Sequence, residues 1–197
     1  MAHIYHHSKA IILPGINIGE ANRLLTIFTR ELGQVRARSQ SARTLTSNLR
    51  FALTDFSMGE VTLVKGREQW KLTSMIKDNN WYQDFRGDME RERILRNVSA
   101  LLLRLFEVEV PHQEMYDALV ETFRFLKEEA LTEEEVKNAE CLLVMRILNE
   151  LGYFPEHPLF DTFIGVRKLS KGFVEEFKPH RALALSQINK SLKESHL

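Results

Sequence analysis

The sequence predicts an α+β protein, with a five-stranded barrel over residues 1–80 and an all-α helical bundle over residues 81–197. In the first part, short runs rich in β-branched residues are separated by turn residues, which is typical of small barrels. In the second part, apolar residues recur every three or four positions, as in amphipathic helices. The charges divide at nearly the same place. Residues 1–77 carry 11 Lys and Arg against 5 Asp and Glu (+6), and residues 78–197 carry 16 against 22 (−6).

The strands of the barrel are predicted from the turns between them. Pro14 and Gly15 interrupt the first run, and Gly33 supplies the positive φ that a tight hairpin requires. The segment Lys65–Arg67 forms a second hairpin turn. The predicted extended runs are residues 4–18, 23–30, 34–41, 51–58, 61–64 and 68–75.

Helices are predicted from residue 88 onwards. The first covers residues 88–108, and the second starts after Pro111. In the third, Thr132 is the expected N-cap with Glu135 as its capping-box partner, and Gly152 ends the helix. A turn-rich break follows at residues 154–160, and the tail at residues 181–197 forms a last helix.

Several classes of protein do not fit this sequence. No apolar run approaches the roughly 20 residues needed to cross a membrane, and the N-terminus lacks the apolar segment of a signal peptide. The single cysteine, Cys141, lies in an apolar helical run and is expected to be a buried, unreactive side chain. There is no glycine-rich phosphate loop and no HExxH or GxSxG motif. We therefore expect a soluble, cytoplasmic, non-enzymatic protein without a metal or cofactor.

A row of arginines on the run 34–41 indicates a binding surface. Alternation places Gln34, Arg36, Arg38 and Gln40 on one face and small, mostly apolar residues on the other, as a barrel interior requires. The two guanidinium groups are about 6.6 Å apart along the strand, a spacing comparable to that of successive phosphates on an extended strand. Arg43 and Arg50 continue the row, and no acidic residue lies between Arg36 and Arg50. We interpret the row as a nucleic-acid contact, the alternative being a solvated outer face.

Four further residues are candidates for the same surface. Arg23 precedes the arginine row, and Arg67 and Lys71 flank the second hairpin turn. Trp70 lies between those two cations, where an aromatic side chain can stack on an unpaired base. A tryptophan in a small barrel can equally belong to the core.

The order of short motifs in the first 80 residues resembles the N-terminal domain of the RecO family of bacterial recombination mediators. That family has a Glu-Ala/Thr pair, an LLTLFT-like strand, an acidic-Gly turn and a basic strand that ends in Lys-Gly-Ala-Arg. The matching residues here are Glu20-Ala21, Leu24–Thr29, Glu31–Gly33, Val35–Ala37 and Ala42-Arg43.

Two features depart from the family pattern. Gln40-Ser41 stand in place of the family's Lys-Gly, which removes one cation from the loop. Many members also carry a four-cysteine zinc module after the position of Gly152, and this chain has none. Because members without zinc exist, the second departure does not argue against the family.

The resemblance implies an OB-fold barrel, binding of single- and double-stranded DNA, and annealing of complementary strands. It also implies a mediator that helps load recombinase onto coated single strands, with RecR, RecA and the single-stranded-DNA-binding protein as partners. For the acidic tail of the last partner, Arg124 and Lys127 are the candidate contacts in the helical part. Two other readings remain open, a protein-binding adaptor whose basic face meets an acidic partner, and an RNA-binding barrel protein.

Overall fold

A computed structural model describes residues 4–18, 22–39, 49–67, 69–166 and 168–194, with the backbone alone for residues 16–18, 22 and 50. The chain forms two compact units. The first comprises Met1–Arg86 and Ser99–Gln113, and the second comprises Gly87–Val98 and Glu114–Leu197. The first unit is predominantly β and the second is all α, as the predicted α+β class requires.

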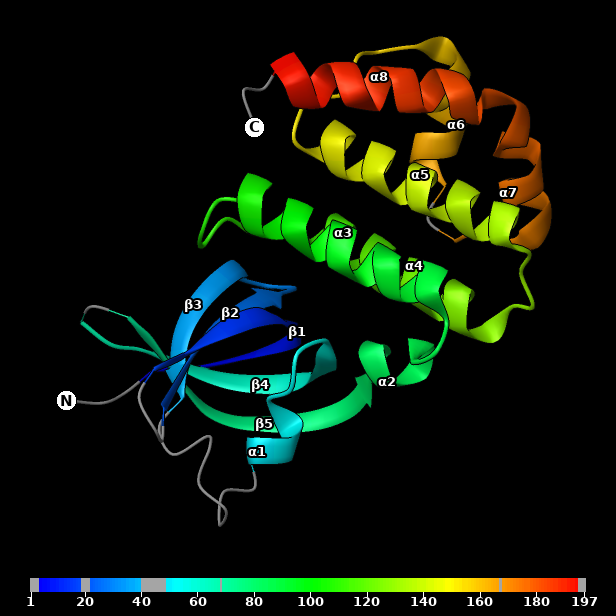
Figure 1. Ribbon diagram of the computed structural model, residues 1–197. Coiled ribbons are helices and arrows are strands. Elements are labelled where there is room, and N and C mark those ends of the chain that lie inside the picture. The colour runs from blue at the N-terminus through cyan, green and yellow to red at the C-terminus, as the bar shows by residue number, and fades with distance from the viewer. Residues whose placement is uncertain (1–3, 19–21, 40–48, 68, 167, 195–197) are drawn as a thin grey trace. The chain divides into compact units, whose positions relative to one another are not determined.

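The first unit is built on a closed five-stranded barrel (Figure 1). The strand order around the barrel is β1-β2-β3-β5-β4, in which β3 and β5 are parallel and the other neighbours are antiparallel. This closure confirms the predicted OB-fold barrel. The strands are β1 (Tyr5–Ile18), β2 (Asn22–Thr29), β3 (Gly33–Ser39), β4 (Ser57–Lys65) and β5 (Trp70–Asn80).

Alternating side chains fill the interior of the barrel, because successive residues of a strand point to opposite faces. Ile12, Leu25 and Val35 are fully buried there, on three consecutive strands. The pairing of β1 with β2 shifts register between Leu13 and Ile16, around the predicted interruption at Pro14 and Gly15. Strands β1 and β2 therefore form close to the predicted runs 4–18 and 23–30, whereas β4 starts four residues before the predicted run 61–64 and β5 extends five residues beyond the predicted run 68–75.

Gly33 opens β3 with a φ of 70°, as predicted for the hairpin turn. A Cβ atom at this position would also lie 1.8 Å from the carbonyl oxygen of Val110. The chain there passes so close that Glu109 donates its backbone N–H to the carbonyl of Gln34 at 2.8 Å. Gln34 is buried beneath this segment, although the alternation predicted it on the open polar face with Arg36.

The predicted strand at residues 51–58 is wrong. Residues Leu49–Ala52 form the short helix α1, and β4 begins only at Ser57. Ala52 and Leu53 belong to the barrel core, so this apolar run contributes to the interior from a helical turn. A short apolar run has the same composition in a buried strand and in a helical turn, which explains the error.

The first unit also contains α2 (Trp81–Phe85) and the C-terminal part of α3 (Met89–Leu105). The Asn80 side chain accepts from the backbone N–H of Gln83 at 2.9 Å and so caps α2. Beyond α3, Phe106 packs edge-on against Phe28, with ring centroids 5.4 Å apart. Phe106 therefore shields the outer side of β2 from solvent at Phe28.

The second unit consists of helices, as predicted. The capping box at the start of α5 is present: the Thr132 hydroxyl accepts from the N–H of Glu135, whose carboxylate accepts from the N–H of Thr132. Gly152 follows the helix with a φ of 73°. The helices are α4 (Gln113–Glu128), α5 (Glu133–Glu150), α6 (Pro158–Gly165), α7 (Lys171–Phe177) and α8 (Arg181–Glu194), with a 3₁₀ turn at Lys178–His180.

The short helices α6 and α7 were not predicted. Each begins with a capping side chain, His157 for α6 and Ser170 for α7. Phe163 of α6 packs edge-on against Phe177 of α7, with ring centroids 5.2 Å apart. Helices of seven or eight residues carry too few turns for their apolar spacing to stand out in the sequence.

Candidate nucleic-acid interface

The outer face of β3 carries two arginines. Arg36 is exposed and Arg38 is half-buried, whereas Val35, Ala37 and Ser39 between and beside them are fully buried. This alternation is the one predicted. The guanidinium groups therefore project from the barrel on the side away from its core.

Lys71 extends this row across the strand boundary. In the parallel pairing of β3 with β5, Ala37 lies opposite Trp70 and Arg38 lies opposite Lys71. Neighbouring strands are about 4.8 Å apart, so Lys71, which is exposed, stands next to Arg38 on the outer surface. We call Arg36, Arg38 and Lys71 the basic face. Lys71 was a candidate because of its place beside the second hairpin turn. Its position next to Arg38 comes from a pairing of residues 33 positions apart, which no local pattern predicts.

Strands β2 and β3 provide no acidic side chain that could neutralise the basic face. On the β2 side, Thr26 is the register partner of Arg36 and Leu24 is the partner of Arg38. The sequences of β2 and β3 contain no Asp or Glu at all. Three cations thus share a surface whose immediate cross-strand neighbours are uncharged, which favours binding of an anion.

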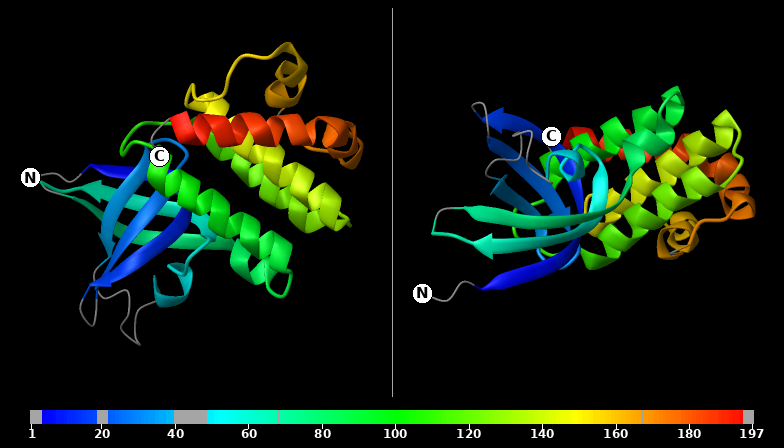
Figure 2. Two further views of the ribbon diagram at one scale, coloured as in Figure 1. Left: turned by 45° about the horizontal axis from the view of Figure 1, so that its top comes forward. Right: turned by 90° about the horizontal axis from the view of Figure 1, so that it is seen from below.

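Arg67 lies in the turn between β4 and β5, and its side chain is exposed. Figure 2 shows this hairpin extending from the rest of the barrel. Lys71 lies at the base of the same turn, in the second residue of β5. The turn therefore adds a cation to the end of the barrel at which β5 begins.

Arg23 has a different environment from Arg36. Its guanidinium group forms an ion pair with Asp55 and donates to the carbonyl of Leu53. Its side chain is only 15% exposed. Arg23 thus ties the start of β2 to the segment after α1, and we leave it out of the proposed binding surface.

Trp70 lies in the core of the barrel, the alternative that the sequence left open. Its side chain is 5% exposed and belongs to the cluster that fills the interior. Its Nε1–H donates to Glu109 at 2.9 Å, and the Lys65 ammonium group lies 5.2 Å from the ring centroid. A buried ring offers no face to a base, so Trp70 is also left out of the proposed surface.

Glu109 and Lys65 were not singled out from the sequence. The Lys65 ammonium group lies 2.5 Å from the Glu109 carboxylate. Hydrogen bonds from Lys65 and Trp70 lower the pKa of Glu109 below its ordinary value of 4.5. Because Glu109 is 39 residues from Trp70 and 44 from Lys65, no spacing in the sequence could have indicated this contact.

Two of the predicted arginines are not placed by the structure. Arg43 lies outside the described residues. Arg50 falls within α1, where only its backbone is described. Their part in the basic row stays a prediction.

The predicted partner-binding pair lies on α4. Arg124 and Lys127 are both exposed, and Arg124 forms an ion pair with Glu121 one turn earlier. An acidic ligand that binds Arg124 would therefore compete with the carboxylate of Glu121.

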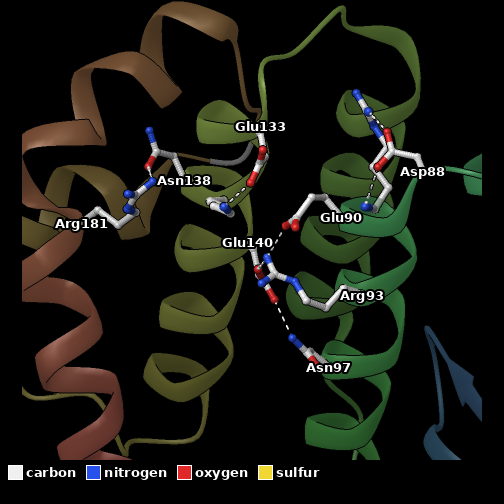
Figure 3. A network of polar contacts seen from close by, with 10 residues as sticks. Asp88, Glu90, Arg93, Asn97, Glu133, Asn138, Glu140 and Arg181 are labelled. Carbon is white, nitrogen blue, oxygen red and sulfur yellow. Dashed lines mark hydrogen bonds and ion pairs between the residues drawn. The ribbon is translucent and has the colours of Figure 1, made fainter.

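A polar network in the second unit lies between α3 and α5 (Figure 3). The Glu140 carboxylate accepts from Arg93 at 2.9 Å and from the side-chain amide of Asn97 at 2.8 Å. Arg93 also forms an ion pair with Glu90 at 2.6 Å. These contacts join two helices and leave Glu140 and Arg93 already partnered, which indicates a structural role.

Within the described ranges, no three His, Cys, Asp or Glu side chains come together as a metal site would need. Cys141 is buried, as predicted, and burial raises the pKa of its thiol to about 12. Among the described helices, none has both the length and the apolar character of a membrane span.

Comparison with known proteins relates both parts of the chain to the same family. Residues 1–77 match the family model described as Recombination protein O N terminal, and residues 86–157 match Recombination protein O C terminal. The chain is 32% identical to DNA repair protein RecO of Gloeothece citriformis over 125 residues, 64% of this chain and 44% of that protein. It is 24% identical to DNA repair protein RecO of Halalkalibacterium halodurans over 200 residues, 96% of this chain and 77% of that protein.

Other curated relatives are matched over about half of their length. DNA repair protein RecO of Acetivibrio thermocellus is 23% identical over 151 residues, which is 77% of this chain and 59% of that protein. The two family models occur in the order of the two predicted parts and together cover most of the chain. The chain belongs to the RecO family of DNA repair and recombination proteins.

Proposed function

We propose that the basic face binds the sugar-phosphate backbone of single-stranded DNA. The observation that carries this proposal is the parallel pairing of β3 with β5, which sets Lys71 beside Arg38 and extends the row from Arg36. Cations that neutralise phosphates provide most of the affinity of a sequence-independent DNA-binding protein. Arginine suits this role because its planar fork grips two phosphate oxygens at once.

The position of the basic face on the barrel supports the proposal. OB-fold barrels bind oligonucleotides across strands 2 and 3, between the loop that joins strands 1 and 2 and the loop that joins strands 4 and 5. Arg36 and Arg38 lie on the third strand, and Arg67 lies in the turn between the fourth and fifth. These three cations thus occur at the places where barrels of this class hold a nucleic-acid strand.

The proposed activity is strand annealing without nucleotide hydrolysis. A cationic surface lowers the repulsion between two strands and raises their local concentration, which needs no catalytic group. Family membership supports the further proposals of double-stranded DNA binding, help in loading recombinase onto coated strands, and partnership with RecR, RecA and the single-stranded-DNA-binding protein. In that scheme Arg124 and Lys127 are the proposed contacts for an acidic partner tail.

The test is a titration of fluorescent oligothymidine at several salt concentrations. Replacing Arg36 and Arg38 together by alanine should flatten the slope of log affinity against log salt by about 1.4, from about 0.7 per phosphate contact on single strands. A matched control replaces Lys190 and Lys193, exposed residues of α8 in the second unit, and should leave the slope unchanged.

An unchanged slope in a folded Arg36→Ala/Arg38→Ala variant would place the DNA site elsewhere on the chain. An unlabelled RNA strand, added as a competitor, tells a preference for DNA from a preference for RNA. Competition weaker than that of DNA of the same length supports the DNA function, whereas stronger competition would favour the RNA-binding alternative.

A further inference from the structure

The outward row that contains Arg38 and Lys71 continues across two more strands of the barrel. Lys71 of β5 is the register partner of Val64 on β4, and Val64 is the partner of Tyr5 on β1 (Figure 2). Directly paired residues of an antiparallel sheet share one face, so Tyr5 lies on the same outer surface as the basic face. Two strand spacings separate Tyr5 from Lys71, which amounts to roughly 10 Å along the row.

Tyr5 is an aromatic side chain that the fold leaves in solvent. It is 58% exposed, and within the described residues it has no hydrogen bond and no contact with another aromatic ring. Its backbone is well placed, because Tyr5–Ile11 pair with β4 in unbroken register. Single-strand-binding surfaces combine such an open ring with neighbouring cations, so that the ring stacks on a base while the cations hold the backbone.

A second ring stands two residues further along the same face of β1. His7 is exposed, and its Nδ1 lies 3.1 Å from the hydroxyl oxygen of Thr62, its register partner. This hydrogen bond restricts the orientation of the imidazole ring. Tyr5 and His7 are about 6.6 Å apart along the strand, the same spacing as between Arg36 and Arg38. Tyrosine and histidine are both among the rings on which proteins stack unpaired bases.

The acidic residue of this outer face is closer to His7 than to Tyr5. Glu60 is four residues before Val64 on β4, or about 13 Å along the strand, and it is the register partner of Lys9. The row from Lys71 through Val64 to Tyr5 therefore reaches Tyr5 before it meets a carboxylate. Of the two rings, Tyr5 is the one placed to receive a base from a strand held on the basic face.

Two further acidic side chains of the described residues lie near this part of the barrel, and each is bonded on the opposite face. Glu31 accepts a hydrogen bond from Ser8, and Glu109 accepts one from Lys65. Ser8 and Lys65 each follow an outward residue of their strand, so their side chains leave from the other face. The surface between the basic face and Tyr5 thus carries no acidic residue within the row.

We propose that Tyr5 stacks on an unpaired base of the strand whose phosphates lie on the basic face. The inference rests on the proposed function and adds the class of substrate that the site selects. The roughly 10 Å between Lys71 and Tyr5 is about the length of a nucleotide from its phosphate to the edge of its base. Stacking on a protein ring requires a base that is not already stacked and paired within a duplex. The site therefore selects single strands over duplexes through Tyr5, whereas the basic face attracts both.

The test compares two oligonucleotides of equal length and charge, oligothymidine and an abasic strand. The variant Tyr5→Ala should weaken binding of oligothymidine at least about fivefold, the lower end of the range for loss of one stacked base, and should leave its salt slope unchanged. Binding of the abasic strand should stay as in the wild type. The variant Tyr5→Phe keeps the ring and should bind both strands as the wild type does. The control Tyr153→Ala, which removes a 42% exposed aromatic of the second unit, should change neither.

A second measurement uses the variant Tyr5→Trp, whose new indole should be quenched by oligothymidine and not by the abasic strand. Trp70 and Trp81 are buried, so the wild type gives the background signal. Wild-type binding by Tyr5→Ala, an equal loss on both strands, or a loss in Tyr5→Phe as large as in Tyr5→Ala overturns the stacking and leaves the basic face standing. Undiminished binding of oligothymidine by Arg36→Ala/Arg38→Ala is a separate result, which overturns the proposed function together with this inference.

Discussion

Glu109 is one of two non-glycine residues with a positive φ in the described part of the first unit, the other being Phe56. The φ of Glu109 is 64°, an uncommon value for a residue other than glycine. Its backbone N–H is bonded to Gln34, and its carboxylate accepts from Trp70 and Lys65. A single residue therefore links β3, β4 and β5 at the end of the barrel where Arg67 lies. These contacts explain why the chain tolerates the conformation.

The contribution of Glu109 to stability should depend on pH. Hydrogen bonds from Lys65 and Trp70 lower the folded-state pKa of Glu109, so its charged form stabilises the fold. The stabilisation is fully present above pH 4.5, and it is lost as the pH falls through the folded-state pKa. Replacing Glu109 by glutamine should cost at most about 1 kcal/mol at pH 7, since the side chain is partly exposed. Urea unfolding at pH 7 and pH 3 measures this.

The control for this prediction is Glu107→Gln, which removes the same charge from an exposed position in the same segment. The two variants should differ at pH 7, and the difference between them should shrink as the pH falls towards 3. A difference between them that is as large at pH 3 as at pH 7 would show that the Glu109 contacts do not depend on its charge.

At the scale of elements, the strands and long helices were predictable because each follows from a local pattern. Period-two alternation gave β3 its exposed Arg36 and buried Val35, and Thr132 marked the start of α5. The helical turn α1 was not predictable, since four residues are too few for a period to be resolved. Neither was the neighbour of Arg38, because the pairing of β3 with β5 depends on closure of the whole barrel.

The start of α5 gives a prediction about one element. Replacing Thr132 by alanine removes the acceptor for the N–H of Glu135 and should destabilise the second unit by about 1 kcal/mol. The variant Thr132→Ser keeps the hydroxyl and should recover most of this loss. Denaturant unfolding followed by circular dichroism measures both, and equal midpoints for alanine and wild type would contradict the role of the capping box.

At the scale of the whole molecule, the net charge of zero combines a basic part with an acidic part. The +6 of residues 1–77 belongs to the part that forms the barrel, whereas the −6 of residues 78–197 is shared equally between the helices and the segments that join them. A protein of uniform charge would attract or repel DNA along its entire length. The proposed function accordingly places the polyanion contact on the basic part and the protein partners on the acidic part.

The central claim, that the basic face acts on single strands, is tested most directly by annealing of two complementary oligonucleotides at low salt. The wild type should speed annealing without ATP or Mg²⁺, and the gain should fade as salt rises, because it comes from neutralised phosphates. The Arg36→Ala/Arg38→Ala variant should lose most of this gain, and the Lys190→Ala/Lys193→Ala control should keep it. A wild type that anneals strands no faster than they pair alone, or that requires ATP, would contradict the account.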